Sequence, residues 1–152
     1  MISATSEYAL RAALVLARVY GKRTMRAEEI ADAIGAPRNY LAKTLNALAK
    51  AGIASSARGP MGGFQLAKDP ALITVSDIID RFDEPRKNAF CLLGSAPCDP
   101  RNPCAAHTRW SAILLARREP LTRTTLSQLI SSDDTDDSPI SNRDYDHAVA
   151  SY

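Results

Sequence analysis

Two short amphipathic segments of this 152-residue chain are separated only by Gly35-Ala36. Apolar residues recur at helical spacing over about residues 26–34, and again from Pro37 to about Ala51, which predicts two helices joined by a two-residue turn. This helix-turn-helix layout constrains the possible folds more than any other feature of the chain. The second helix is predicted to direct toward the core the side chains of Tyr40, Leu41, Thr44, Leu45 and Leu48.

The segments on either side of this pair complete a winged-helix pattern. Residues 6–20 have the apolar spacing of another amphipathic helix. Residues 53–56 and 63–66 are strand-like and flank a turn rich in Gly and Pro, which is typical of a hairpin. Three helices followed by a basic hairpin describe a winged helix. We therefore expect a mainly α fold, with a winged helix-turn-helix DNA-binding domain over residues 1–83.

The next part of the chain contains one more predicted helix and then an irregular segment. A capping box at Thr74-Val75-Ser76-Asp77 predicts a short helix with Ile78, Ile79 and Phe82 buried. Residues 84–106 contain four prolines and all three cysteines of the chain, and no helical or strand period fits them. A loop of this length in a small domain is usually functional or disordered. We refer to residues 84–106 as the cysteine segment.

A long helix is predicted to resume at His107 and to end or kink at Pro120, because proline lacks the N–H that a helix interior needs. Its apolar stripe consists of Trp110, Ile113 and Leu114. A domain this small leaves no partner for that stripe, so we expect residues 107–131 to contain a dimerisation helix and a last short helix. The last helix has its cap at Thr125 and its apolar face at Leu129 and Ile130.

Composition and charge limit the class of protein. Apolar residues make up 45% of the chain, enough to form a core, and no stretch approaches the roughly 20 apolar residues of a membrane helix. The N-terminus has no signal-peptide pattern, so we expect a cytoplasmic protein without membrane contact. Residues 132–152 hold six Asp and one Arg, a net charge of −5 against +7 for residues 1–131, and we expect this acidic tail to be disordered. Residues 35–68 hold five basic side chains and no acid, which suggests a polyanion-binding surface.

The helix-turn-helix and the hairpin together supply candidate DNA contacts. The second helix of such a pair enters the major groove with its N-terminal residues nearest the base edges, where Arg and Lys match guanine and Asn matches adenine. Glycines let a hairpin backbone approach a phosphate, and Arg58 can enter a narrow minor groove. Outward basic residues also occur on ordinary solvated helices, but the order of elements here favours DNA binding. The candidates are Arg38, Asn39, Tyr40 and Lys43 in the helix, with Ala42 also facing outward, and Arg58, Gly59, Gly62 and Gly63 in the hairpin.

The cysteines are candidate metal ligands. Cys91, Cys98 and Cys104 follow a C-x6-C-x5-C spacing, and His107 follows the last of them at C-x2-H. Thiolates are soft donors that hold Zn²⁺ or iron–sulfur clusters. Three interpretations are open: a cluster, a structural zinc site lacking the usual C-x2-4-C knuckle, and a thiol–disulfide switch that leaves one thiol unpaired. Ordinary buried cysteines are disfavoured, because a Pro-rich polar loop has no core to fill.

The hairpin and the helices before it resemble the iron–sulfur winged-helix transcriptional regulators of the IscR, NsrR and RirA type, over about residues 1–131. The resemblance is carried by Ser6-Glu7-Tyr8-Ala9-Leu10-Arg11, Tyr40-Leu41, Leu45, Leu48, Ala51-Gly52-Ile53 and the run from Ser56 to Leu66. It implies that Arg58 reads the minor groove and that Asn39, Ala42 and Lys43 lie on the base-contacting face. Ala42 stands where IscR-type members commonly have an acidic residue, which alters the expected operator.

The same resemblance favours a cluster over zinc. Cluster-binding members have three cysteines in this loop, and the segment from Cys104 to Trp110 is similar to the C-x2-H-x2-W run of the IscR type. The implied ligands are therefore Cys91, Cys98, Cys104 and His107, with a [2Fe-2S] cluster favoured over [4Fe-4S]. The NsrR type completes its cluster with a carboxylate from the other subunit, and Glu7 stands at that position.

The sequence thus predicts a homodimeric transcriptional repressor that binds a palindromic double-stranded DNA operator and responds, through an iron–sulfur cluster, to redox state, nitric oxide or iron status. The alternative is a winged-helix DNA-binding protein with a structural zinc site or a thiol–disulfide switch. An enzyme is not expected. Nucleophilic catalysis needs a base and an orienting group near the thiol, and the chain offers only His107 and His147.

Overall fold

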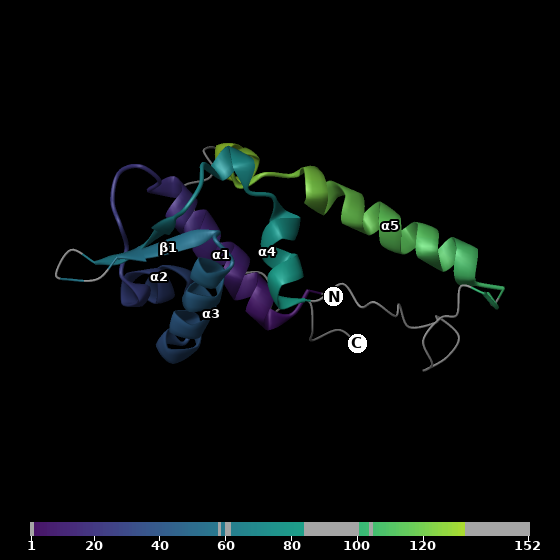
Figure 1. Cartoon of the computed structure of the whole chain (residues 1–152), viewed down its shortest axis with the longest axis horizontal. Helices are drawn as coiled ribbons and strands as arrows, with labels where there is room; N and C mark the ends of the chain where they lie inside the picture. Colours follow the sequence, from purple (N-terminus) through teal and green to yellow (C-terminus); the bar gives the residue numbers. More distant parts are fainter. Residues whose placement is uncertain (1, 58, 60–61, 84–100, 104, 133–152) are drawn as a thin grey trace, which may run out of the picture.

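The structure is a computed structural model that describes residues 2–57, 59, 62–83, 101–103 and 105–132. Figure 1 shows a helical body, a short hairpin and one long helix that extends away from the body. No helix in these ranges is long and apolar enough to cross a membrane. In chain order the elements are α1 (Ala4–Arg18), α2 (Ala27–Ile34), α3 (Arg38–Lys50), β1 (Ala54–Ala57), β2 (Gly63–Leu66), the short 3-10 helix η1 (Pro70–Leu72), α4 (Val75–Phe82), α5 (His107–Arg123) and α6 (Leu126–Ser132).

The core forms around α1, which contacts α2, α3, α4, α6 and β2 (Figure 1). One face of α1 carries the buried alanines Ala9, Ala12, Ala13 and Ala17. Their short side chains let the neighbouring helices approach closely, and larger apolar side chains of those neighbours fill the remaining space. The fully buried members of this set are Ile30, Ile34, Leu41, Leu45, Leu48, Ile73, Ile78 and Leu126.

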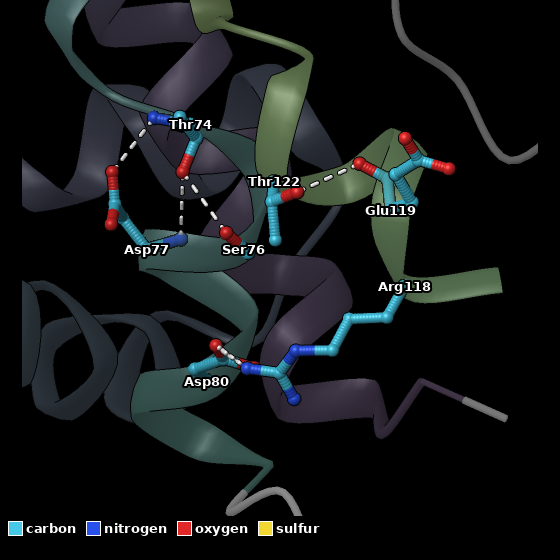
Figure 2. A network of polar contacts seen from close by, with 7 residues as sticks. All are labelled: Thr74, Ser76, Asp77, Asp80, Arg118, Glu119 and Thr122. Atoms are coloured by element: carbon cyan, nitrogen blue, oxygen red, sulfur yellow. Dashed lines mark hydrogen bonds and ion pairs between the residues drawn. The ribbon is translucent and has the colours of Figure 1, made fainter. Parts of the chain in front are cut away.

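The predicted caps of the inner helices are confirmed. Gly35 ends α2 with a φ of 65°, and Gly52 follows α3 with a φ of 70°, both in the left-handed region that favours glycine. At the start of α4, the Thr74 hydroxyl accepts a hydrogen bond from the Asp77 N–H at 3.2 Å, and the Asp77 carboxylate accepts one from the Thr74 N–H at 2.9 Å (Figure 2). These caps fix where each helix starts or stops.

The first helix begins and ends two residues earlier than the predicted range of 6–20. The Ser3 hydroxyl accepts a hydrogen bond from the Ser6 N–H at 3.2 Å and caps the helix there. Tyr20, the last residue of that predicted range, lies beyond the end of α1 and is 39% exposed.

Of the two outcomes predicted at Pro120, an end or a kink, the structure contradicts the end, because α5 continues to Arg123. Pro120 cannot donate to the preceding turn, but the turn that follows has its own hydrogen bonds. The Thr122 hydroxyl donates to the carbonyl of Glu119 at 2.8 Å, and the Thr124 hydroxyl donates to that of Pro120 at 2.8 Å. The Thr122 bond is drawn in Figure 2. These bonds stabilise the last turn of α5.

The C-terminal helix is attached to the body through two backbone hydrogen bonds. The Val75 N–H donates to the Thr124 carbonyl, and the Leu126 N–H donates to the Ile73 carbonyl, both at 2.9 Å. Leu126 is fully buried, whereas the predicted contact residues Leu129 and Ile130 are only half-buried. The main anchor of α6 is therefore its first residue.

The hairpin packs on α1 and α3 and also makes one close backbone contact with the body. Strands β1 and β2 pair antiparallel, and Phe64 in β2 also exchanges two hydrogen bonds of 2.9 and 2.7 Å with the backbone of Met25. At the adjacent Gly63, a Cβ atom would lie 2.6 Å from the Met25 carbonyl oxygen. Glycine is needed there for the two backbones to approach.

We expect Gly63→Ala to destabilise the fold by about 1–3 kcal/mol, because the added methyl group would overlap the Met25 backbone. The midpoint of thermal unfolding measures this loss. Gln65→Ala, at an exposed position of the same strand, is the control and should leave the midpoint nearly unchanged. Equal midpoints for Gly63→Ala and the wild type would contradict the contact.

Candidate nucleic-acid interface

The turn between α2 and α3 fixes how α3 is presented. After the left-handed Gly35, the Ala36 N–H donates to the Ala31 carbonyl at 2.9 Å. Pro37 is the N-cap of α3, and its carbonyl accepts a hydrogen bond from the Leu41 N–H at 3.0 Å. The inner face of α3 is buried against the body through Leu41, Thr44, Leu45 and Leu48. Only its opposite face is available to a partner.

The outer face of α3 is polar and cationic. Asn39, Lys43, Asn46 and Lys50 are all exposed, and their spacing places them on one side of the helix. No acidic residue occurs between Gly35 and Lys68, so nothing within that stretch neutralises these lysines. The predicted candidates Asn39 and Lys43 therefore lie on one solvent-facing surface.

Arg38, the first residue of α3, is exposed but already engaged. Its guanidinium forms an ion pair with the carboxylate of Asp32 in α2, with a shortest distance of 2.9 Å. Helical spacing does not predict this pair, because the two residues belong to different helices.

Two side chains of α3 differ from their predicted orientation. Tyr40, predicted toward the core, is 38% exposed at the edge of α3. Its ring packs edge-on against Tyr8 with centroids 5.8 Å apart, and its hydroxyl contacts the hydroxyl of Thr5. Ala42, predicted to face outward, is half-buried. Tyr40 thus joins α3 to the first turns of α1.

The tip of the hairpin contains a tight turn. Gly59 is exposed with a φ of 108°, and the Gly62 N–H donates to its carbonyl at 2.8 Å. Arg58, the predicted minor-groove residue, lies outside the described residues. Gly63 is also predicted to contact DNA, and in the structure its backbone approaches that of Met25.

The structure describes only two of the predicted metal ligands, Glu7 and His107. Cys91, Cys98 and Cys104 lie outside the described residues, and within the described ranges no three His, Cys, Asp or Glu side chains come together as a metal site. His107 is half-buried at the start of α5. Glu7 is exposed on α1, with its carboxylate 3.6 Å from the Arg11 guanidinium.

Comparison with known proteins identifies the family. The family model of Rrf2, described as an iron-dependent transcriptional regulator, matches residues 2–132. The chain belongs to the Rrf2 family. It is therefore a transcriptional regulator and not an enzyme, as the sequence predicted, and its fold is the winged helix-turn-helix of that family.

Individual relatives agree with this assignment. A candidate helix-turn-helix-type regulator of Aquifex aeolicus is 37% identical over 93% of this chain and 99% of its own. IscR of Vibrio vulnificus is 30% identical over 88% of this chain and 79% of its own. Among solved structures, CymR, the global cysteine regulator of B. subtilis, covers 87% of this chain and 97% of its own at a TM-score of 0.74 and 30% identity. IscR of T. potens covers 91% of both chains at a TM-score of 0.73 and 27% identity.

For an Rrf2-family regulator with this geometry, we expect Lys43→Ala to weaken binding to a selected DNA duplex by about 1–3 kcal/mol, because Lys43 is on the outer face of the recognition helix. Fluorescence anisotropy titrations measure the affinity. Arg81→Ala is the matched control, since it removes the same charge from an exposed position on α4. Equal losses for the two variants would mean that Lys43 contributes only to the net charge.

Proposed function

We propose that this Rrf2-family chain is a homodimeric transcriptional repressor whose operator binding is controlled by an iron–sulfur cluster in the cysteine segment. The observation that carries the proposal is a hydrogen bond of 2.9 Å from the Ser3 N–H to the Asp83 carboxylate. Asp83 is the last described residue before the cysteine segment, and Ser3 caps α1. A change in the segment therefore acts directly on the start of the central helix.

The donor set suits a cluster. Cys91, Cys98 and Cys104 supply three thiolates, the ligand type that iron–sulfur clusters prefer. His107, three residues after Cys104 and half-buried, is the proposed fourth ligand of a [2Fe-2S] cluster. Glu7 of the partner subunit is the alternative, since its carboxylate is exposed. When bound, such a group supplies a redox-active centre, and its loss releases the order that it imposes on the segment.

Asp83 is connected to the recognition helix through α1. From the cap at Ser3, one turn of α1 leads to Thr5 and Tyr8, and both side chains contact Tyr40 in α3. We infer that a rearrangement next to Asp83 shifts the first turns of α1 and, through Tyr40, the N-terminal end of α3. This end is the part of α3 nearest the base edges in a helix-turn-helix.

The Asp83 carboxylate, which accepts the hydrogen bond from Ser3, is charged over the physiological pH range. Burial raises the pKa of Asp83, but hydrogen bonds from Ser3 and Ser6 lower it by more, so the pKa lies below the usual value for an aspartate. The stability that this carboxylate contributes is present above about pH 4 and is lost only as the pH falls through its lowered pKa. The link is therefore altered by displacement of the chain rather than by protonation near neutral pH.

The long helix provides the proposed dimer interface. Among the α5 residues whose side chains are described, none is buried, and Ile113 and Leu115 are 50% and 68% exposed. In Figure 2, α5 contacts the body through the ion pair between Arg118 and Asp80 on α4. A second copy of the chain would cover the exposed apolar side chains and place two α3 helices on one palindromic duplex.

Ile113 and Leu115 point to different sides of α5, so an interface along this helix would cover at least one of them. Replacing both with Asp should therefore give monomers, because each protomer would bury an unpaired carboxylate in that interface. Sedimentation velocity measures the mass of the particle. Leu72→Asp is the control, because Leu72 is 72% exposed on η1 and this variant should remain dimeric. A dimeric double variant would place the interface elsewhere.

Protein purified without oxygen should be brown and absorb between about 300 and 500 nm, as iron–sulfur proteins do. Cys98→Ala should lose this absorption and the bound iron while remaining dimeric. Ser95→Ala, a change of similar size in the same segment, should retain both. A colourless wild-type protein would contradict the cluster.

The colour and metal content of the same sample also distinguish the cluster from a second candidate function. CymR of Staphylococcus aureus is a relative with two similar solved structures, one of them of an oxidized form. A thiol–disulfide switch is therefore the main alternative to the cluster. A colourless protein with bound zinc would indicate a structural metal site, and a metal-free protein with a redox-dependent disulfide would indicate the thiol switch.

A further inference from the structure

The ion pair between Arg38 and Asp32 spans the helix-turn-helix. Asp32 lies on α2 and Arg38 is the first residue of α3. The carboxylate accepts three hydrogen bonds from the guanidinium: from Nε to Oδ1 at 3.3 Å, from Nη2 to Oδ1 at 3.1 Å, and from Nη2 to Oδ2 at 2.9 Å. The acid therefore engages one side of the guanidinium group.

The opposite side of the guanidinium remains open. The group is planar and its five N–H bonds point in fixed directions, so the Nη1 side faces away from the bonds that Nε and Nη2 make to Asp32. Nη1 has no hydrogen bond or ion pair within the part of the chain that the structure describes. The Arg38 side chain is 63% exposed, so this free edge faces solvent at the start of the recognition helix.

Within the described residues, the Asp32 side chain forms hydrogen bonds and an ion pair with Arg38 alone. It is 62% exposed. Glu29 on the same helix differs, because it accepts a hydrogen bond from the Arg26 N–H at 2.6 Å and so caps α2. An exposed ion pair adds little to the free energy of unfolding. We therefore expect Asp32 to act mainly by fixing the orientation of the Arg38 side chain.

We propose that Asp32 is a specificity-determining residue that holds Arg38 in position to read a guanine in the major groove. The free edge of the guanidinium presents two donors, and guanine presents the O6 and N7 acceptors that match them. Fixing the arginine before binding removes part of the cost of ordering a long side chain.

This inference rests on the proposed DNA-binding function and makes Asp32 a positioning residue. The opposite role, in which Asp32 masks Arg38 and must release it to DNA, predicts tighter binding when the acid is removed. The two roles therefore differ in the sign of the effect on the selected site.

The test begins with selection of duplexes from a random-sequence library by the wild type and by Arg38→Ala. The base pair whose enrichment is lost in Arg38→Ala is the position that Arg38 reads. Anisotropy titrations then compare the selected duplex with one in which that G·C pair is replaced by A·T. We expect the wild type to prefer the selected duplex about tenfold or more.

Asp32→Ala should reduce this preference to within about threefold while leaving discrimination at other positions intact. Glu28→Ala is the matched control. It removes the same charge from an exposed position on α2 and should preserve the full preference. The double variant Asp32→Ala/Arg38→Ala should discriminate no worse than Arg38→Ala alone, and the thermal midpoint of Asp32→Ala should equal that of the wild type.

Tighter binding of Asp32→Ala with its preference unchanged would overturn the inference and establish the masking role. Identical base preferences of Arg38→Ala and the wild type would also overturn it, since Arg38 would then read no base. In both cases DNA binding as such would stand. If the wild type enriched no sequence, the proposed function and this inference would fail together.

Discussion

The packing of the alanine face of α1 is the interaction on which the rest of the structure depends. With Ala9, Ala12 and Ala13 fully buried, five other elements come close to a single helix. That helix is capped beside Asp83 at one end and contacts Tyr40 of the recognition helix one turn later. A larger side chain at any of these alanines would separate α3 and α4 from α1, and with them the DNA-reading surface from the start of the cysteine segment.

Much of the body could be predicted from local sequence, because local signals decide it. Gly35 and Gly52 stop helices because few other residues accept a positive φ, and the Thr74 capping box acts within four residues. Contacts between distant residues could not be predicted in this way. The Leu126 N–H donates to the Ile73 carbonyl, and Phe64 of the hairpin exchanges two backbone hydrogen bonds with Met25.

The exposed residues of the DNA-binding surface could be predicted from the sequence, but the contacts between its side chains could not. Helical spacing correctly placed Asn39 and Lys43 on the outer face of α3. Spacing alone says nothing about which acid a basic residue meets, so the pair of Arg38 with Asp32 appears only in three dimensions. The DNA contact of Gly63 stays a prediction, and the structure adds a close approach to Met25 that spacing did not predict. The metal donors were proposed from residue type and family resemblance, and the cysteines themselves remain a prediction.

The central claim is that the state of the cysteine segment controls the affinity for DNA. The most direct measurement is a pair of anisotropy titrations of one selected duplex, with protein prepared without oxygen and with the same protein after its metal is removed by a chelator, both confirmed as dimers. We expect the two dissociation constants to differ by about tenfold or more, in line with a typical coupling free energy between two sites. Equal dissociation constants for the two dimers would contradict it.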